Sequence, residues 1–127
     1  MMLPSNVRVF VALDPIDMHA SFDRLAGRVR ATMNLDPTAG HLFVFVNRPR
    51  THLKVLFFER SGYAILYKRL ARGTFELPKV DGAGHVQLDP AELAALLEGI
   101  DLGSAKRRLR YKHPVVDPAK ADVGRSA

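Results

Sequence analysis

Acidic side chains are the first candidates for chemistry in this sequence, because a metal-dependent nuclease or strand transferase needs two or three carboxylates around divalent ions. The three best predicted strands contribute only Glu59, which stands at a strand end beside a turn. The N-terminal aspartates occupy predicted turns or helix starts, where capping alone accounts for them. They are Asp14, Asp17, Asp23 and Asp36. We therefore predict capping, and a nuclease that depends on Glu59 is the least favoured hypothesis.

The other residue types that carry out enzymatic chemistry form no recognisable site either. The five histidines lack the spacing of metal ligands, and no serine stands in a Gly-x-Ser-x-Gly context. Cysteine is absent, which excludes disulfides, zinc fingers and thiol catalysis. Gly82-Ala83-Gly84 lacks the lysine and the following helix of a phosphate-binding loop, so we predict a hairpin turn there. The sequence thus predicts no catalytic residue, no metal site and no cofactor.

Basic side chains give a stronger signal, because charge is segregated along the chain. Residues 47–72 hold seven basic groups against Glu59 alone, whereas residues 73–104 hold six acids against Lys79. Basic groups on adjacent strands and turns can neutralise phosphates, with Tyr63 or Tyr67 available for stacking. The predicted nucleic-acid contacts are Arg48, Arg50, Lys54, Lys68, Arg69 and Arg72. Alternatively, the tyrosines are core residues, the lysines protect a sheet edge, and the charge maintains solubility.

A second basic segment follows the acidic one. Residues 105–127 hold seven basic groups against two acids. The predicted DNA contacts in this arm are Lys106, Arg107, Arg108 and Arg110. Such an arm is a common non-specific DNA contact and equally a solubilising tail. Because the segment is polar and ends in small residues, we predict that it is largely disordered.

The first half of the chain predicts a strand, a helix and a second strand. Val7–Leu13 is rich in β-branched residues and ends at an Asp-Pro turn. Asp17 can cap a helix that continues to about Arg30. The apolar stripe of this helix would be Met18, Phe22, Leu25 and Val29. Leu42–Val46 is an unbroken apolar run, which predicts a strand buried on both faces near the centre of the sheet.

The second half predicts a meander, a short strand pair and a helix. Leu53–Glu59 and Tyr63–Arg69 complete an antiparallel meander with the preceding strand, and Phe75–Leu77 pairs with His85–Leu88. The last helix has a capping box and a hydrophobic staple in its sequence. Its signals are Asp89 at the N-cap, Pro90 and Glu92 behind it, Leu88 with Leu93 as the staple, and Gly99 at the stop.

Together these elements predict an α+β fold in the order β-α-β-β-β-(β-β)-α. The sheet is mainly antiparallel with about five to six strands, and two helices lie on one of its faces. The length of 127 residues fits one domain, residues 1–104, followed by the basic tail of residues 105–127. Neither a membrane span nor a signal peptide is recognisable, so we expect a cytoplasmic protein.

Several linked motifs resemble one family. The pattern Asp36-Pro37-x-x-Gly40-His41-Leu42-Phe43-Val44-Phe45-x-Asn47-Arg48 is similar to the core signature of the small TnpB-type accessory protein of the insertion sequence 66 family of bacterial transposons. The resemblance covers roughly residues 7–101. It continues through Leu53-Lys54-Val55-Leu56, Arg60-x-Gly62-Tyr63, Tyr67-Lys68-Arg69-Leu70 and Gly73-x-Phe75. His19-Ala20 departs from the family, which usually has an arginine-lysine pair there.

The resemblance implies a non-catalytic protein encoded beside a separate, larger transposase that carries out strand transfer. The family offers no established catalytic residues to transfer to this chain. Two hypotheses follow. In the first, the protein binds DNA backbone with little sequence specificity and assists the transposase. In the second, it is a protein adaptor for the transposase without affinity for DNA, and it docks through the basic meander or the acidic region around Glu92, Glu98 and Asp101.

Overall fold

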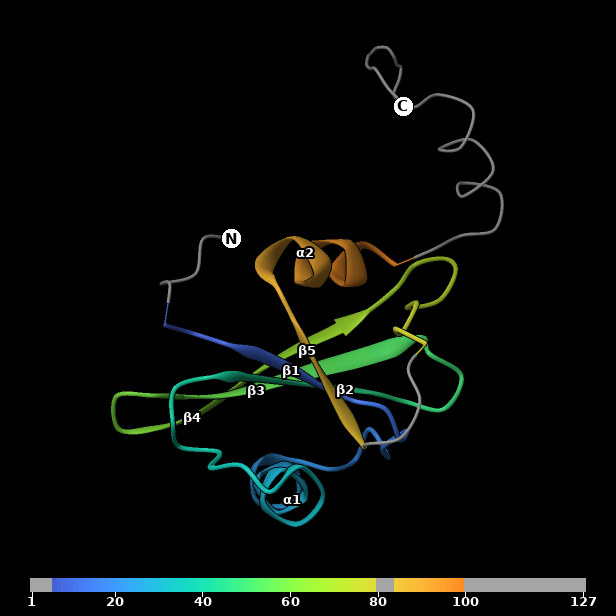
Figure 1. The fold of residues 1–127 in the computed structure, drawn as a ribbon. Coiled ribbons are helices and arrows are strands. Elements are labelled where there is room, and N and C mark those ends of the chain that lie inside the picture. The colour runs from blue at the N-terminus through green and yellow to red at the C-terminus, as the bar shows by residue number, and fades with distance from the viewer. Residues whose placement is uncertain (1–5, 80–83, 100–127) are drawn as a thin grey trace.

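The computed structural model describes residues 6–79 and 84–99. In these two ranges the chain forms one five-stranded sheet and two α-helices, which confirms the predicted α+β fold (Figure 1). The strand order across the sheet is β4-β3-β2-β1-β5. The strands are β1 (Val9–Ala12), β2 (Leu42–Val46), β3 (His52–Glu59), β4 (Gly62–Arg69) and β5 (His85–Leu88). No helix in the described ranges is long and apolar enough to cross a membrane.

The central strand is β2, as its unbroken apolar sequence predicted. All five of its residues are buried. It pairs in parallel with β1 and antiparallel with β3, while β3–β4 and β1–β5 are antiparallel as well. The sheet is therefore mainly antiparallel, with one parallel pair joined by the helical connection between β1 and β2.

The two helices lie on opposite faces of the sheet, so the prediction that they share one face is wrong (Figure 1). Leu42, Val44 and Val46 pack in the core beneath α2 (Pro90–Glu98), whereas Phe43 and Phe45 pack in the core beneath α1 (Phe22–Arg28). Since side chains alternate along a strand, an entirely apolar central strand needs a cover on each face. Each helix supplies one of these covers.

The first helix begins later and ends differently than predicted. The Asp17 carboxylate does not cap it but accepts a hydrogen bond from the backbone N–H of His19 at 2.8 Å, which forms a local turn. Ser21 occupies the N-cap position, and α1 continues into a π-helical turn, η1 (Val29–Met33). Asn34 then ends the helix with a left-handed backbone. The sequence signal at Asp17 was a turn signal, because aspartate stabilises both kinds of structure.

The second helix has the predicted caps. The Asp89 carboxylate accepts from the backbone N–H of Glu92 at 2.7 Å, and the Glu92 carboxylate accepts from the backbone N–H of Asp89 at 2.9 Å. Gly99 ends the helix with a φ of 75°. The positive φ favours glycine there, and a Cβ atom would in addition displace the Leu70 side chain, whose nearest methyl carbon would lie 2.5 Å away.

Residues 75–77 do not form the predicted strand. Phe75 and Leu77 are buried in the core beneath α2, and the backbone N–H of Phe75 donates to the carbonyl of Arg50 at 2.7 Å. The strand β5 pairs with β1 instead. The segment therefore uses its apolar side chains to fill the core beside the helix rather than to extend the sheet. Residues 81–83 of the predicted hairpin turn lie outside the described residues.

Candidate nucleic-acid interface

The β2–β3 turn and the end of β4, which carry predicted basic contacts, lie at the same end of the sheet. Strands β2 and β4 end there and β3 begins there, because β3 is antiparallel to both. His52 pairs with Arg69, and the backbone N–H of Leu70 donates to the carbonyl of Thr51 at 3.0 Å. The hydrogen bond from the backbone N–H of Phe75 to the carbonyl of Arg50 also joins the β2–β3 turn to the chain that follows β4. The β2–β3 turn therefore lies against the chain that follows β4.

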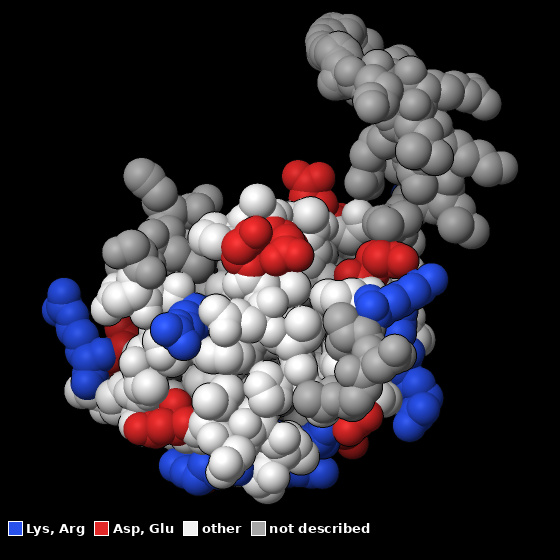
Figure 2. Space-filling view, in the orientation of Figure 1, with Lys and Arg blue, Asp and Glu red and all other residues white. Residues whose placement is uncertain are grey.

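Four predicted residues come together at this end, and we call this surface the arginine end. It consists of Arg48, Arg50, Arg69 and Arg72, all of which are exposed. Among the described residues, no carboxylate lies within 4 Å of the guanidinium groups of Arg48, Arg50 and Arg69. Figure 2 shows basic side chains around the rim of the molecule, and acidic side chains both over α2 and between the basic ones on the rim. The arginine end is thus a concentration of cationic side chains on a surface that is otherwise mixed in charge.

Asn47 builds the turn that carries two of these arginines. Its side-chain oxygen accepts from the backbone N–H groups of Thr51, at 2.9 Å, and His52, at 3.0 Å. The backbone N–H of Arg50 donates to the Asn47 carbonyl at 3.0 Å, and Arg50 itself has a φ of 61°. These bonds fix the backbone beneath Arg48 and Arg50. Binding would therefore order the two side chains but not the turn.

The structure gives Lys54 and Lys68 internal contacts. Lys54 is only 8% exposed, and its ammonium donates to the carbonyls of Met18 at 2.6 Å and Ala20 at 2.8 Å. Lys68 donates to the carbonyl of Leu97 at 2.6 Å, where the last turn of α2 concentrates negative partial charge. Both ammonium groups are used within the protein, so neither is included in the interface argued below.

The two tyrosines considered for stacking differ in exposure. Tyr63 packs against the α1-side core with its hydroxyl buried, whereas Tyr67 is 53% exposed. Tyr67, His52 and Arg69 line an open hollow of about 280 Å³ at the arginine end. His52 was missed by the sequence interpretation. Its position opposite Arg69, at the start of β3, could have indicated it.

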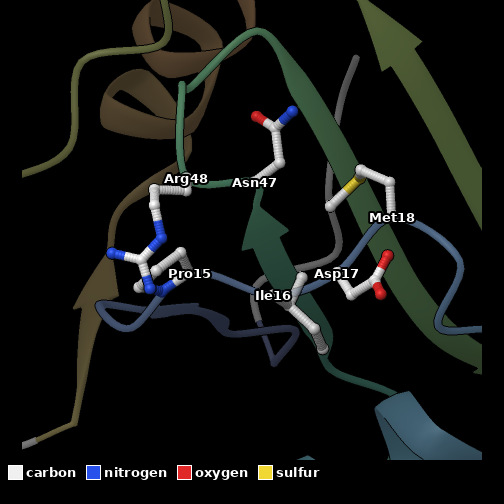
Figure 3. A pocket seen from close by; sticks show the side chains of 6 residues that line it. All are labelled: Pro15, Ile16, Asp17, Met18, Asn47 and Arg48. Atoms are coloured by element: carbon white, nitrogen blue, oxygen red, sulfur yellow. The ribbon is translucent and has the colours of Figure 1, made fainter.

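A second hollow, of about 460 Å³, lies between the β1–α1 connection and the β2–β3 turn. Figure 3 shows the Arg48 guanidinium beside Pro15 and the Asp17 carboxylate near Met18. The backbone N–H and then the side chain of His19 hold the pKa of Asp17 below 3.8, so the carboxylate is ionised at neutral pH. The negative charge of Asp17 disfavours binding of a phosphate within this hollow.

Acidic residues lie at both ends of the sheet. Glu59 ends β3 at the end opposite the arginine end, and Asp89 and Glu92 are exposed at the start of α2. Glu98, in contrast, lies in the last turn of α2, which contacts Lys68 and Leu70 beside the arginine end. Within the described ranges, no three histidine or carboxylate side chains are placed to hold a metal ion. The predicted contacts of the C-terminal arm lie outside the described residues. They are Lys106, Arg107, Arg108 and Arg110.

Comparison with known proteins gives one family. The model of the IS66 Orf2-like protein matches residues 7–107. The chain is 44% identical over 102 residues to the uncharacterized protein y4hO of Sinorhizobium fredii, covering 79% of this chain and 88% of that protein. It is 33% identical over 116 residues to the uncharacterized protein y4jC of the same organism, covering 91% of this chain and 93% of that protein. No solved structure matches the chain.

Proposed function

The chain belongs to the family of IS66 Orf2-like proteins, and on this premise we propose that it is a non-catalytic accessory protein that holds DNA backbone at the arginine end. An accessory role in an insertion sequence follows from the family. The proposal adds the DNA contact, a cytoplasmic site of action and a partner, the separate transposase of the same element.

The observation that supports this proposal is the convergence of four exposed arginines on a fixed turn and an adjoining strand end. A guanidinium binds phosphate oxygens through two parallel hydrogen bonds, so several of them in one place suit a DNA backbone. Base reading in the major groove would need an exposed polar helix or ribbon. Neither helix has an outer face of that kind, because α1 exposes Phe22 and Asp23 beside Arg24 and α2 exposes Glu92 and Glu98. Binding is therefore expected to be electrostatic, with little sequence preference.

A triple variant tests this proposal: Arg48→Gln, Arg50→Gln and Arg69→Gln together. Each arginine that contacts phosphate releases about 0.9 counterion from duplex DNA, so the slope of log affinity against log salt should fall by about 2 to 3. Affinity at moderate salt should fall roughly tenfold or more. Fluorescence anisotropy with transposon-end and scrambled duplexes across a salt series measures both quantities.

A charge-matched control separates the site from net charge. Arg8→Gln, Arg30→Gln and Arg60→Gln remove the same three charges from exposed positions. Arg8 precedes β1 and Arg60 follows β3, at the end of the sheet opposite the arginine end, while Arg30 lies on η1. This variant should keep nearly the original salt slope. Equal losses in the two triple variants would show that affinity follows net charge and would remove the arginine end as the site.

A second candidate function, docking on the transposase, is supported by a different surface. An apolar hollow of about 320 Å³ lies between residues 76–78 and α2, with Leu77, Leu88 and Leu96 in its lining. Glu76 and Glu92 also line it, and Asp89 and Glu98 are exposed nearby on the chain. An apolar hollow with an acidic rim suits a segment of the transposase that carries an apolar side chain between basic ones.

Ala95→Arg tests this docking surface, because Ala95 is exposed and lines the hollow. The larger, positively charged side chain should fill the hollow and repel a basic segment. Purified transposase of the same element should then co-purify with the wild-type protein but not with the variant. Ala94→Arg places the same side chain on an exposed residue of the same helix outside the hollow, and it should have no effect. Undiminished co-purification of Ala95→Arg would reject this surface.

A further inference from the structure

Among the described residues, Tyr67 is the most exposed of the large aromatic side chains. On its face of β4, Tyr63 and Ile65 pack against the α1-side core, but Tyr67 extends beyond that core and leaves 53% of its surface in solvent. A large aromatic side chain in water loses the stabilisation that burial would provide. No residue of β4 is fully buried and Leu66 is also exposed, so the argument for a ligand rests on the groups that surround the Tyr67 ring and not on its exposure alone.

The ring of Tyr67 contacts two other side chains of the protein, Lys54 and His52. The Lys54 ammonium lies over the ring, 4.9 Å from its centroid, and is itself fixed by the carbonyls of Met18 and Ala20. The His52 ring lies 5.9 Å from the Tyr67 ring at an angle of 37°. A cation over one face of an aromatic ring both positions and polarises it. The buried lysine therefore acts as a support for the exposed aromatic.

The hollow in front of these residues adjoins the arginine end. Tyr67, His52 and Arg69 line its volume of about 280 Å³, and Arg69 belongs to both surfaces. A planar group stacked on Tyr67 would therefore have a guanidinium at its side. An aromatic face next to a cation is the arrangement that binds a nucleobase together with its own phosphate. Bases within a duplex have their faces covered by neighbours, whereas an unpaired base has a face free.

We propose that Tyr67 is a stacking site for an unpaired DNA base whose phosphate contacts Arg69. The inference rests on the proposed DNA contact and deepens it by naming the form of DNA that the site prefers: single strands, frayed ends or gaps. His52 flanks the base, and Lys54 is a positioning residue that acts through the tyrosine ring. The preference is for unpaired structure and not for sequence, because every base presents a stacking face.

The test compares a short single strand with a blunt duplex by fluorescence anisotropy. Tyr67→Ala should weaken binding of the single strand roughly fivefold or more and leave duplex affinity within about twofold. Tyr67→Phe keeps the ring and should retain most of the single-strand affinity. Leu66→Ala is the matched control, since Leu66 is the adjacent exposed residue of β4, at 45%, and points to the other face. It should leave both affinities unchanged.

The fluorescence of a single strand that contains 2-aminopurine reports base stacking directly. It would not change if Tyr67 had only a structural role. The fluorescence should be quenched on binding to the wild-type protein and to Tyr67→Phe, but not at saturating Tyr67→Ala. Absence of quenching with the wild-type protein, or equal losses for single strand and duplex in Tyr67→Ala, would overturn the stacking site. Neither result affects the arginine end, which the duplex salt slope of the triple variant tests separately. Conversely, an unchanged salt slope with specific loss in Tyr67→Ala would reject the arginine end and retain the stacking site.

Discussion

Replacing Phe75 with alanine is expected to lower the free energy of unfolding by about 3 to 5 kcal/mol. Phe75 is fully buried in the core beneath α2, although it belongs to no strand or helix. Truncation removes a large apolar surface and leaves a cavity between the sheet and the helix. Because small domains are stable by only about 5 to 15 kcal/mol, the variant should lie close to the limit of folding.

Urea denaturation followed by circular dichroism measures this loss for Phe75→Ala. Phe22→Ala is the matched control, since it makes the same chemical change at a residue that is 43% exposed, and it should cost about 1 kcal/mol or less. A Phe75→Ala protein that unfolds at the same urea concentration as Phe22→Ala would contradict the assigned packing of residues 75–77.

Replacing Lys54 with methionine is expected to lower the free energy of unfolding by about 2 to 3 kcal/mol. Hydrogen bonds from a charged donor contribute about 1.5 to 3 kcal/mol each, and Lys54 makes two to backbone carbonyls. Part of this loss is offset because the variant no longer buries a charge. The remaining cost arises from the carbonyls of Met18 and Ala20, which lose their donor just before α1 begins.

Thermal and urea unfolding compare Lys54→Met with Lys68→Met, which removes one bond from a less buried ammonium and should cost about 1 kcal/mol. Equal stability of Lys54→Met and the wild-type protein would show that desolvation cancels the two bonds. A loss of duplex affinity in Lys54→Met at temperatures where it remains folded would return Lys54 to the DNA interface.

Local sequence signals predicted those elements whose structure is decided locally. The capping box of Asp89 and Glu92 and the stop at Gly99 are formed as expected. The five apolar residues of Leu42–Val46 correctly predicted a central strand, and the meander followed from its turns. In each case the residues that allowed the prediction are the same residues that form the hydrogen bonds or become buried.

Predictions failed where distant segments decide the outcome. Phe75–Leu77 has a strand-like composition, but the core beneath α2 takes its side chains and β5 occupies the neighbouring edge of β1. The doubly buried β2 already required a cover on each face, which the prediction of helices on one face overlooked. Period and propensity do not specify which face or edge a segment meets.

The candidate site divides in the same way. Arg48, Arg50 and Arg69 stand at turns and strand ends, and the predicted meander was sufficient to bring them to one end of the sheet. Lys54 and Lys68 lie inside strands, where a long side chain can reach a neighbouring backbone carbonyl. In the sequence, these three arginines and two lysines are all simply positively charged residues. Only the packing of α1 and α2 against the sheet distinguishes a surface cation from an internal one.

The pairing of β5 with β1 joins two segments that are synthesised far apart in time. Val9 lies opposite Leu88, so β1 obtains its second neighbour from β5, the last strand of the described ranges. The helix that covers one apolar face of the sheet follows still later. A nascent or prematurely terminated chain would therefore carry an open strand edge and an uncovered apolar face, both of which promote aggregation.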